Sequence, residues 1–171
     1  LRMRRLADHE NRGIRIILTG QAEDKDAEGL EIQANLLRLA KQYPDVLTVI
    51  VGFDLLLGQR LYAAGDAFGM PSRFEPAGIS QQIANVYGTP VIAARTGGLK
   101  DFFDTWGGVG WSHAPGDSVQ MANLMIEAAQ IHRDSPQQWQ ELVVQATKYN
   151  SSWDSRILEY EKNVYGPAHK N

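Results

Sequence analysis

The sequence predicts an α/β protein: a Rossmann-like parallel sheet with helices on both faces, ending in a helical segment. Three observations support this. Short runs of β-branched and aliphatic residues alternate with stretches of helical periodicity, glycine or proline closes most of these runs, and the last third shows helical periodicity only. Such alternation is typical of βαβ units with right-handed crossovers. A length of 171 residues suits one ordinary domain.

The apolar runs are the predicted strands, and the first is expected to be buried because β-branched residues dominate it. A helix with Ile32, Leu36 and Leu39 at helical spacing follows that run and ends by Pro44. The predicted strands are residues 14–19, 46–51, 67–70 and 90–94, and the other connecting helices are residues 55–64 and 79–87.

The last third begins with a glycine-rich corner at residues 107–110 and contains three predicted helices and no predicted strand. Asp117 and Ser118 can cap the first of these helices, and Pro136 suits the first turn of the second. In the first helix the expected core positions are Ala122, Met125, Ile126 and Ala129. We expect one domain over residues 1–150 and a closing helical segment over residues 151–171.

Composition excludes several classes of function. The net charge is −3, and the one basic cluster (Arg2, Arg4 and Arg5) lies in a predicted helix at the start, so no nucleic-acid partner is expected. There is no cysteine and the four histidines are scattered, so we expect neither metal nor cofactor. No signal peptide or membrane-spanning run is present, which predicts a soluble protein without a membrane partner.

The candidate binding residues follow the predicted strands. Ligands of open parallel sheets bind outside the carboxyl ends of the strands, and there the sequence places Phe53, Arg73, Glu75 and the pair Gly97-Gly98. Each has a simpler explanation: Phe53 as core, Glu75 as a charge favoured by a helix dipole, and the glycines as a tight turn. Because all of them are predicted at the same edge of the sheet, we favour a binding site over these separate explanations.

These stretches resemble a known family. Residues 70–79 (MPSRFEPAGI), 87–90 (YGTP) and 96–101 (TGGLKD) closely resemble the donor-binding half of bacterial glycogen synthases and plant starch synthases. The likeness continues upstream through Gly52, Phe53 and residues 60–66, and downstream through residues 108–111 to Trp153 and Tyr160. It therefore covers nearly the whole chain and implies the C-terminal half of a GT-B glycosyltransferase. Residues 1–150 would then be an N-terminally truncated, donor-nucleotide-binding domain, and the helix in residues 151–171 would pack toward a missing N-terminal domain.

The resemblance implies a retaining glucosyltransferase that uses ADP-glucose or UDP-glucose and an α-1,4-glucan acceptor, without metal. Glu75 would act catalytically beside the donor glucose, and Phe53 would stack on the base where the family usually has tyrosine. The other residues that the resemblance assigns to donor binding are Gly52, Arg73, Ala77, Gly78, Ile79, Ser80, Thr96, Gly97 and Gly98.

Other features differ from the family or leave alternatives open. Ala77 replaces a common cysteine, and Gln82 stands where other GT-B branches carry a second glutamate. The family's diphosphate-binding Arg and Lys precede this stretch and are absent, as is the acceptor domain, so the chain alone is expected to be inactive. A stand-alone nucleotide-sugar-binding module and a transferase for another sugar stay open. The expected location is cytoplasmic for a bacterial source and plastid for a plant or alga.

Overall fold

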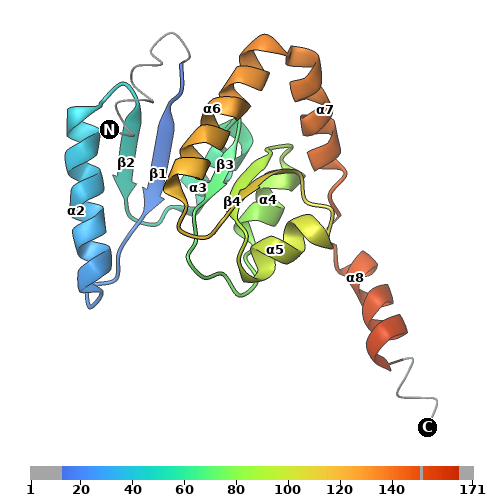
Figure 1. Ribbon diagram of the computed structural model, residues 1–171. Coiled ribbons are helices and arrows are strands. Elements are labelled where there is room, and N and C mark those ends of the chain that lie inside the picture. The colour runs from blue at the N-terminus through green and yellow to red at the C-terminus, as the bar shows by residue number, and fades with distance from the viewer. Residues whose placement is uncertain (1–12, 151, 166–171) are drawn as a thin grey trace.

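The structure is a computed structural model that describes residues 13–150 and 152–165 (Figure 1). The basic cluster and the helix predicted at the start lie outside these residues. The strands are β1 (Ile16–Gly20), β2 (Leu47–Val51), β3 (Phe68–Met70), β4 (Val91–Ala94) and β5 (Gly110–His113). The helices are α2 (Ala27–Gln42), α3 (Leu55–Ala64), α4 (Ser80–Val86), α5 (Gly97–Asp104), α6 (Ser118–Asp134), α7 (Pro136–Thr147) and α8 (Trp153–Tyr160), followed by a π-helical turn (Glu161–Tyr165).

The described strands form two parallel sheets. One pairs β1 with β2, in register from Ile16 opposite Leu47 to Gly20 opposite Val51. The other has the order β3-β4-β5. The predicted α/β class with parallel strands and crossover helices is confirmed, but the strands do not form one continuous sheet.

Two elements were not predicted from the sequence. The prediction of no strand in the last third is wrong, because β5 pairs in parallel with β4 from Gly110 to His113. This strand has only four residues, GWSH, and two of them are polar, so no apolar run marks it in the sequence. Helix α5 was also missed, because Gly97 and Gly98, which indicated a turn, are its first two residues.

The predicted burial of the first strand is wrong. Ile17 is 50% exposed and Leu18 is 36% exposed, and Leu47 is the one buried residue among the strands β1 and β2. Helix α2 has no buried residue. The β1-α2-β2 unit therefore contributes little to the core, and no further described strand covers the outer edge of β1.

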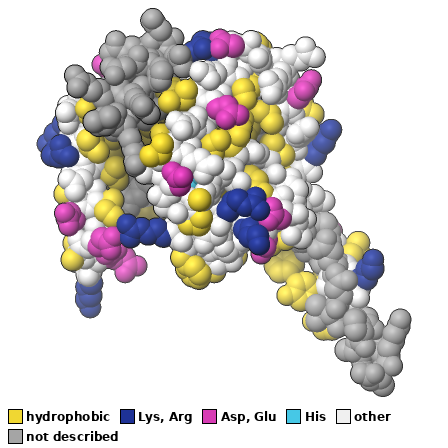
Figure 2. All heavy atoms as spheres, viewed as in Figure 1, with side chains coloured by type: hydrophobic (Ala, Val, Ile, Leu, Met, Phe, Trp, Pro, Cys, Tyr) yellow, Lys and Arg dark blue, Asp and Glu magenta, His cyan; other side chains and the backbone are white. Residues whose placement is uncertain are grey.

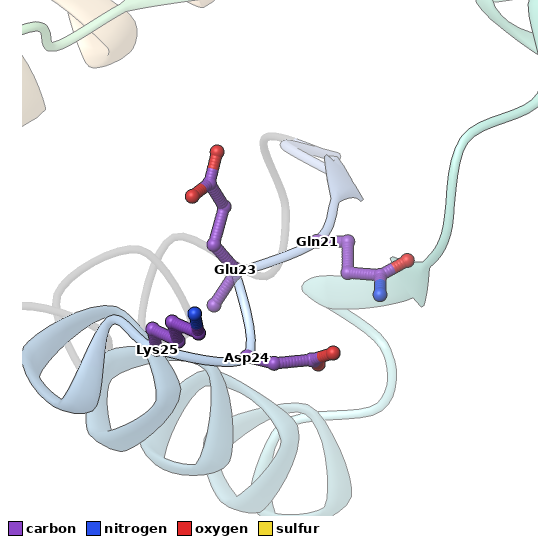
Figure 3. A pocket seen from close by; sticks show the side chains of 5 residues that line it. Gln21, Glu23, Asp24 and Lys25 are labelled. Atoms are coloured by element: carbon purple, nitrogen blue, oxygen red, sulfur yellow. The ribbon is translucent and has the colours of Figure 1, made fainter.

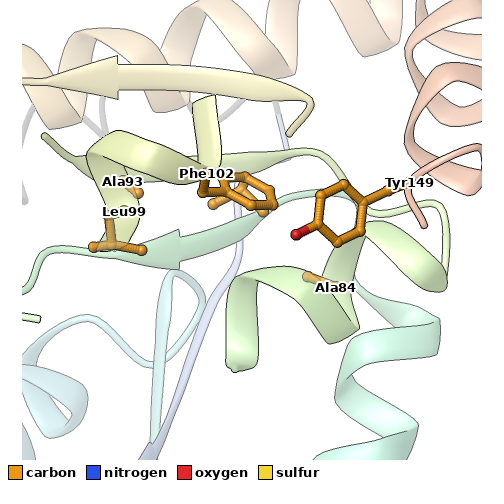
Figure 4. Close-up of a cluster of buried hydrophobic side chains, with 6 residues drawn as sticks. Ala84, Ala93, Leu99, Phe102 and Tyr149 are labelled. Atoms are coloured by element: carbon orange, nitrogen blue, oxygen red, sulfur yellow. The ribbon is translucent and has the colours of Figure 1, made fainter. Parts of the chain in front are cut away.

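The core lies around β4, all four residues of which are buried. On one face Phe102 is fully buried against Tyr149, with Ala84, Val91, Ala93 and Leu99 completing the cluster (Figure 4). On the other face Ile92 packs with Ala128 and Trp139. The core-facing positions of α6 are Met121, Leu124, Met125, Ala128 and Ile131. The predicted positions were thus one residue out of phase, except Met125, because apolar residues occur on several sides of this helix.

The helix boundaries in the last third follow their caps. The Asp117 carboxylate accepts from the backbone N–H groups of Val119 and Gln120 at 3.1 and 2.9 Å, as predicted. Pro136 is the first residue of α7, also as predicted. After α7 the chain leaves the body, and α8 projects away from it in Figure 1.

Candidate donor site at the strand ends

Two loops that were predicted to share an edge are joined in the structure. The β3–α4 loop carries Arg73 and Glu75, and the β4–α5 loop carries Thr96. The backbone N–H of Gly98 donates to the carbonyl oxygen of Glu75 at 2.9 Å. The hydroxyl of Thr96 lies 3.5 Å from the carbonyl oxygen of Arg73. The start of α5 therefore holds the segment that contains both charged residues.

The two glycines at the start of α5 allow this close approach. Gly97 has φ +43°, and a Cβ there would lie 2.1 Å from the carbonyl oxygen of Glu75. A Cβ on Gly98 would lie 2.3 Å from the carbonyl oxygen of Ala77. A side chain at either position would collide with backbone, which has no rotamer to change. The pair thus does more than make a turn: it is a packing surface for the β3–α4 loop.

Two glutamines hold the far end of this loop, and neither contact was predicted from the sequence. The fully buried Gln81 donates from Nε2 to the carbonyl oxygens of Ala77 at 2.9 Å and Gly78 at 3.0 Å. Gln82 donates to the same Gly78 oxygen at 2.9 Å. Gly78 itself has φ +73°. The pair of glutamines just after the glycine was the available sequence signal, since a polar side chain next to a turn often bonds its carbonyls.

The side chain of Glu75 is available for a ligand. It is half-buried, and its carboxylate makes no hydrogen bond or ion pair with any other residue that the structure describes. Ala77 and Ile79 beside it are exposed, and the N-cap position of α4 makes no side-chain hydrogen bond. Ser80 is the first residue of that helix. A carboxylate, open backbone and a hydroxyl therefore lie along one short loop.

Phe53 and Gly52 lie at the end of the other sheet. Phe53 is 86% exposed, so the alternative that it belongs to the core is wrong. It follows directly on Gly52, which has φ +133° and donates its N–H to the carbonyl oxygen of Gly20 at 3.1 Å. An aromatic ring so exposed at a strand end is free to stack on a planar ligand.

Arg73 connects the two sheets. Its guanidinium donates to the carboxylate of Glu28 on α2 at 2.9 Å, with both side chains more than two-thirds exposed. The positive charge of Arg73 is therefore paired with Glu28 and leaves the carboxylate of Glu75 without a cationic partner. A second bridge nearby joins Arg95 to Asp104 at 2.6 Å across the start and end of α5.

Other parts of the surface show fewer features of a binding site. Residues 21–25 after β1 line a shallow, open pocket in which Glu23, Asp24 and Lys25 extend in different directions (Figure 3). Figure 2 shows basic and acidic side chains interspersed over the visible face. Among residues 13–150 and 152–165 we find no group of three or more potential metal ligands. The helices in the same ranges are all too short or too polar to cross a membrane.

Together the fold and the loops define a class: a parallel α/β ligand-binding domain with polar, glycine-framed loops at the carboxyl ends of its strands. The model of the family "Glycosyl transferases group 1" matches residues 3–143, and the chain belongs to this family. Glycogen synthase from Streptococcus uberis is 39% identical over 130 residues, which are 72% of this chain and 27% of the relative. Glycogen synthase from Desulfitobacterium hafniense is 34% identical over 157 residues, 89% of this chain and 32% of the relative. The chain thus spans about a third or less of the length of these relatives.

Solved structures agree on the fold. The catalytic domain of starch synthase IV from Arabidopsis thaliana, bound to ADP and acarbose, superposes with a TM-score of 0.67 at 23% identity. The match covers 92% of this chain and 40% of that one. Sucrose-phosphate synthase from Thermosynechococcus elongatus gives a TM-score of 0.63 over 92% of this chain and 39% of that one, also at 23% identity. These matches are consistent with the C-terminal half of a GT-B fold, as the sequence predicted.

Proposed function

We propose that this chain is the donor-binding part of a retaining glucosyltransferase that transfers glucose from ADP-glucose or UDP-glucose to the non-reducing end of an α-1,4-glucan. The observation that carries the proposal is the unpaired carboxylate of Glu75 on a loop whose backbone is held by Gly98 and Gln81. Family membership and the similarity to glycogen synthases support it.

Glu75 would stabilise the reacting sugar. Positive charge develops at the anomeric carbon as the bond to the diphosphate breaks, and a carboxylate fixed beside that carbon lowers the energy of this state more than that of the bound substrate. The fixed backbone of residues 75–78 supports this role, because a carboxylate that is already in place needs no reorganisation during the reaction.

The remaining residues would position the donor. Backbone N–H groups of Ala77, Gly78 and Ile79 would bind sugar hydroxyls, and Ser80 would lie near the distal phosphate. The exposed ring of Phe53 would stack on the base. Arg73, Gly52 and the residues Thr96, Gly97 and Gly98 would complete the walls of the site. Neither a metal nor a cofactor takes part in this proposal.

The parent enzyme would supply what this stretch lacks. We infer that the Arg and Lys that neutralise the leaving diphosphate come from a preceding segment, and that an N-terminal domain binds the acceptor. Helix α8 would pack toward that domain: Trp153 is 80% exposed and Leu158 is 64% exposed, more than a helix with a covered apolar face leaves free. The 171-residue chain would then bind nucleotide weakly without turnover.

Calorimetric titration with ADP, UDP and ADP-glucose tests the donor site. We expect Phe53→Ala to weaken the binding of every nucleotide, since stacking is lost, and Glu75→Ala to weaken the binding of ADP-glucose only, since ADP has no glucose for it to contact. Tyr160→Ala and Glu127→Ala are matched controls, because both residues are exposed on helices away from the strand ends. Equal binding of ADP-glucose by Glu75→Ala and the parent chain would contradict the assigned role of Glu75.

The alternative of a binding module without catalysis makes the same binding predictions but differs in activity. Joined to the acceptor domain and the diphosphate-binding segment of a related glycogen synthase, the chain should transfer glucose to glycogen, and the Glu75→Ala form should not. A chimera that binds ADP-glucose and acceptor but shows no transfer would favour the module.

A further inference from the structure

One arginine side chain ties together the two ends of helix α5. Arg95 lies between Ala94, the last residue of β4, and Thr96, the N-cap of α5. Its Nη2 atom donates to both carboxylate oxygens of Asp104, the last residue of α5, at 2.7 and 2.6 Å. Hydrogen bonds between two charged groups are shorter and roughly twice as strong as neutral ones. The pair therefore fixes the end of α5 to the residue just before its start.

The same arginine also holds this corner to the sheet. The backbone N–H of Arg95 donates to the carbonyl oxygen of His113 at 2.9 Å. Its Nη1 atom lies 3.4 Å from the hydroxyl of Ser112, and both partners belong to β5. Because Arg95 contacts β5 and Asp104 at once, the end of α5 is held in a set direction relative to the sheet.

Asp104 would be unfavourable at its position without this partner. The C-terminus of a helix carries partial negative charge, so a carboxylate there is repelled unless a cation lies close by. The last turn of α5 contains no basic residue. Within the part of the chain that the structure describes, Arg95 forms the one ion pair with Asp104. The two side chains are 40% and 39% exposed, so water screens the pair only in part.

The other end of α5 holds the loop that carries Glu75. Gly98 donates its backbone N–H to the carbonyl oxygen of Glu75 at 2.9 Å. The middle of the helix is anchored in the core by Leu99 and Phe102, both fully buried (Figure 4). A tilt of α5 about these two anchors would move Gly98 and Asp104 in opposite directions. Holding Asp104 in place therefore keeps Gly98 against the Glu75 loop.

We propose that Arg95 is a positioning residue for the carboxylate of Glu75 and acts through Asp104 and α5. The inference rests on the catalytic role given to Glu75 in the proposed function. The carboxylate has no partner among the described residues, so the path of the backbone decides where it lies. A misplacement of about 1 Å can cost up to ~100-fold in rate, because a group that stabilises the transition state has to be in place beforehand. Arg95 has this effect without touching the donor.

Amide hydrogen exchange measured by NMR tests the mechanical step without any ligand. In the 171-residue chain, Arg95→Met keeps the side-chain stem and removes the bonds to Asp104, and Asp104→Ala removes the other partner. Each should speed exchange of the Gly98 amide about 10-fold relative to the amides of β4, which open only with the sheet. The double variant should exchange no faster than the single variants, because both changes remove the same contact.

Arg133 and Asp134 provide a matched control. They form another doubly hydrogen-bonded pair, at 2.6 and 2.5 Å, and are 40% and 58% exposed. The pair lies at the end of α6, next to the turn into α7 and away from the strand ends (Figure 1). Arg133→Met and Asp134→Ala should leave the exchange of Gly98 unchanged. If Arg95→Met speeds Gly98 and β4 equally, or leaves Gly98 as it was, the positioning role is overturned.

Kinetics of the chimera described above test the consequence for catalysis. Arg95→Met and Asp104→Ala should each lower kcat about 10-fold and change KM for ADP-glucose by less than about 2-fold, because the carboxylate of Glu75 acts in the transition state. Arg95→Lys can still form one charged hydrogen bond with Asp104, so its kcat should lie between those of Arg95→Met and the parent. The Arg133→Met chimera should keep the parent kcat.

Two kinetic results would overturn the proposal. The first is an unchanged kcat in both variants while exchange of Gly98 is faster, which would mean that Glu75 does not depend on this corner. The second is weaker binding of ADP in Arg95→Met but not in Asp104→Ala, which would make Arg95 a direct ligand of the diphosphate. A parent chimera without transferase activity would instead contradict the proposed function, and the exchange of Gly98 would still decide whether Arg95 holds the corner.

Discussion

A methyl group added to Gly98 should disrupt the candidate site more than its size suggests. In Gly98→Ala the new Cβ would lie 2.3 Å from the carbonyl oxygen of Ala77 and 2.4 Å from its Cα. Ordinary contact begins at 3.4 Å. Helix α5 and the β3–α4 loop must therefore separate by roughly 1 Å, since backbone atoms cannot rotate away as a side chain can.

The separation has a second cost. It would lengthen the hydrogen bond from Gly98 to the carbonyl oxygen of Glu75, now 2.9 Å, beyond bonding distance. Overpacking of this kind costs about 1–3 kcal/mol, and the lost hydrogen bond about 1 kcal/mol more. We expect Gly98→Ala to lower the free energy of unfolding by about 2–4 kcal/mol.

Urea denaturation of Gly98→Ala and Gly58→Ala measures this. Gly58 is inside α3, and a Cβ added there would meet no atom within 4 Å, so alanine should raise the stability by about 0.5–1 kcal/mol. The same substitution is thus expected to change the free energy of unfolding in opposite directions at two helical glycines. A loss below about 1 kcal/mol for Gly98→Ala, at an unchanged m-value, would refute the account of the glycine pair as a tight packing surface.

Three further predictions concern the core and the link between the sheets. Asn85→Ala should lower the free energy of unfolding in urea by at least about 2 kcal/mol, because a buried amide that bonds one N–H and two carbonyls is lost. Asn35→Ala, on the exposed face of α2, is the control and should change the stability by less than about 0.5 kcal/mol. Equal effects of the two substitutions would contradict the role given to Asn85. Phe102→Ala should cost about 3–5 kcal/mol, since its ring is fully buried, and a thermal melt that hardly shifts would argue against that core. A double-mutant cycle on Arg73 and Glu28 should give a coupling of about 0.2–1 kcal/mol that vanishes near ~1 M salt. A coupling that persists in high salt would show that the pair is less exposed than described.

The sequence predicted those elements whose hydrophobic pattern is local. Strand β4 was found because it is a continuous apolar run, and α6 and α7 because Asp117 and Pro136 mark their starts. Strand β5 was missed because half of its residues are polar and its position depends on pairing with β4. The exposure of Ile17 could not be predicted, because burial depends on which strand lies beside it.

The candidate site, like the fold, was predicted only in part. The topology of a parallel sheet was enough to place Arg73, Glu75 and Phe53 at strand ends. The bonds from Gln81 to two carbonyls could not be predicted, since they require the detailed path of the β3–α4 loop. Nor could the pairing of Arg73 with Glu28, 45 residues away in the sequence. The assigned binding roles and the boundary at residue 150 stay predictions.

The projection of α8 makes Trp153 an optical reporter. An indole that is 80% exposed emits at longer wavelength than a buried one and is readily quenched by iodide, whereas Trp139 is buried and Trp106 and Trp111 are partly buried. Any domain or subunit that covers α8 would shift the emission of Trp153 to shorter wavelength and protect it from iodide. The part of the tryptophan emission that iodide quenches most readily therefore reports the docking of whatever partner this helix meets.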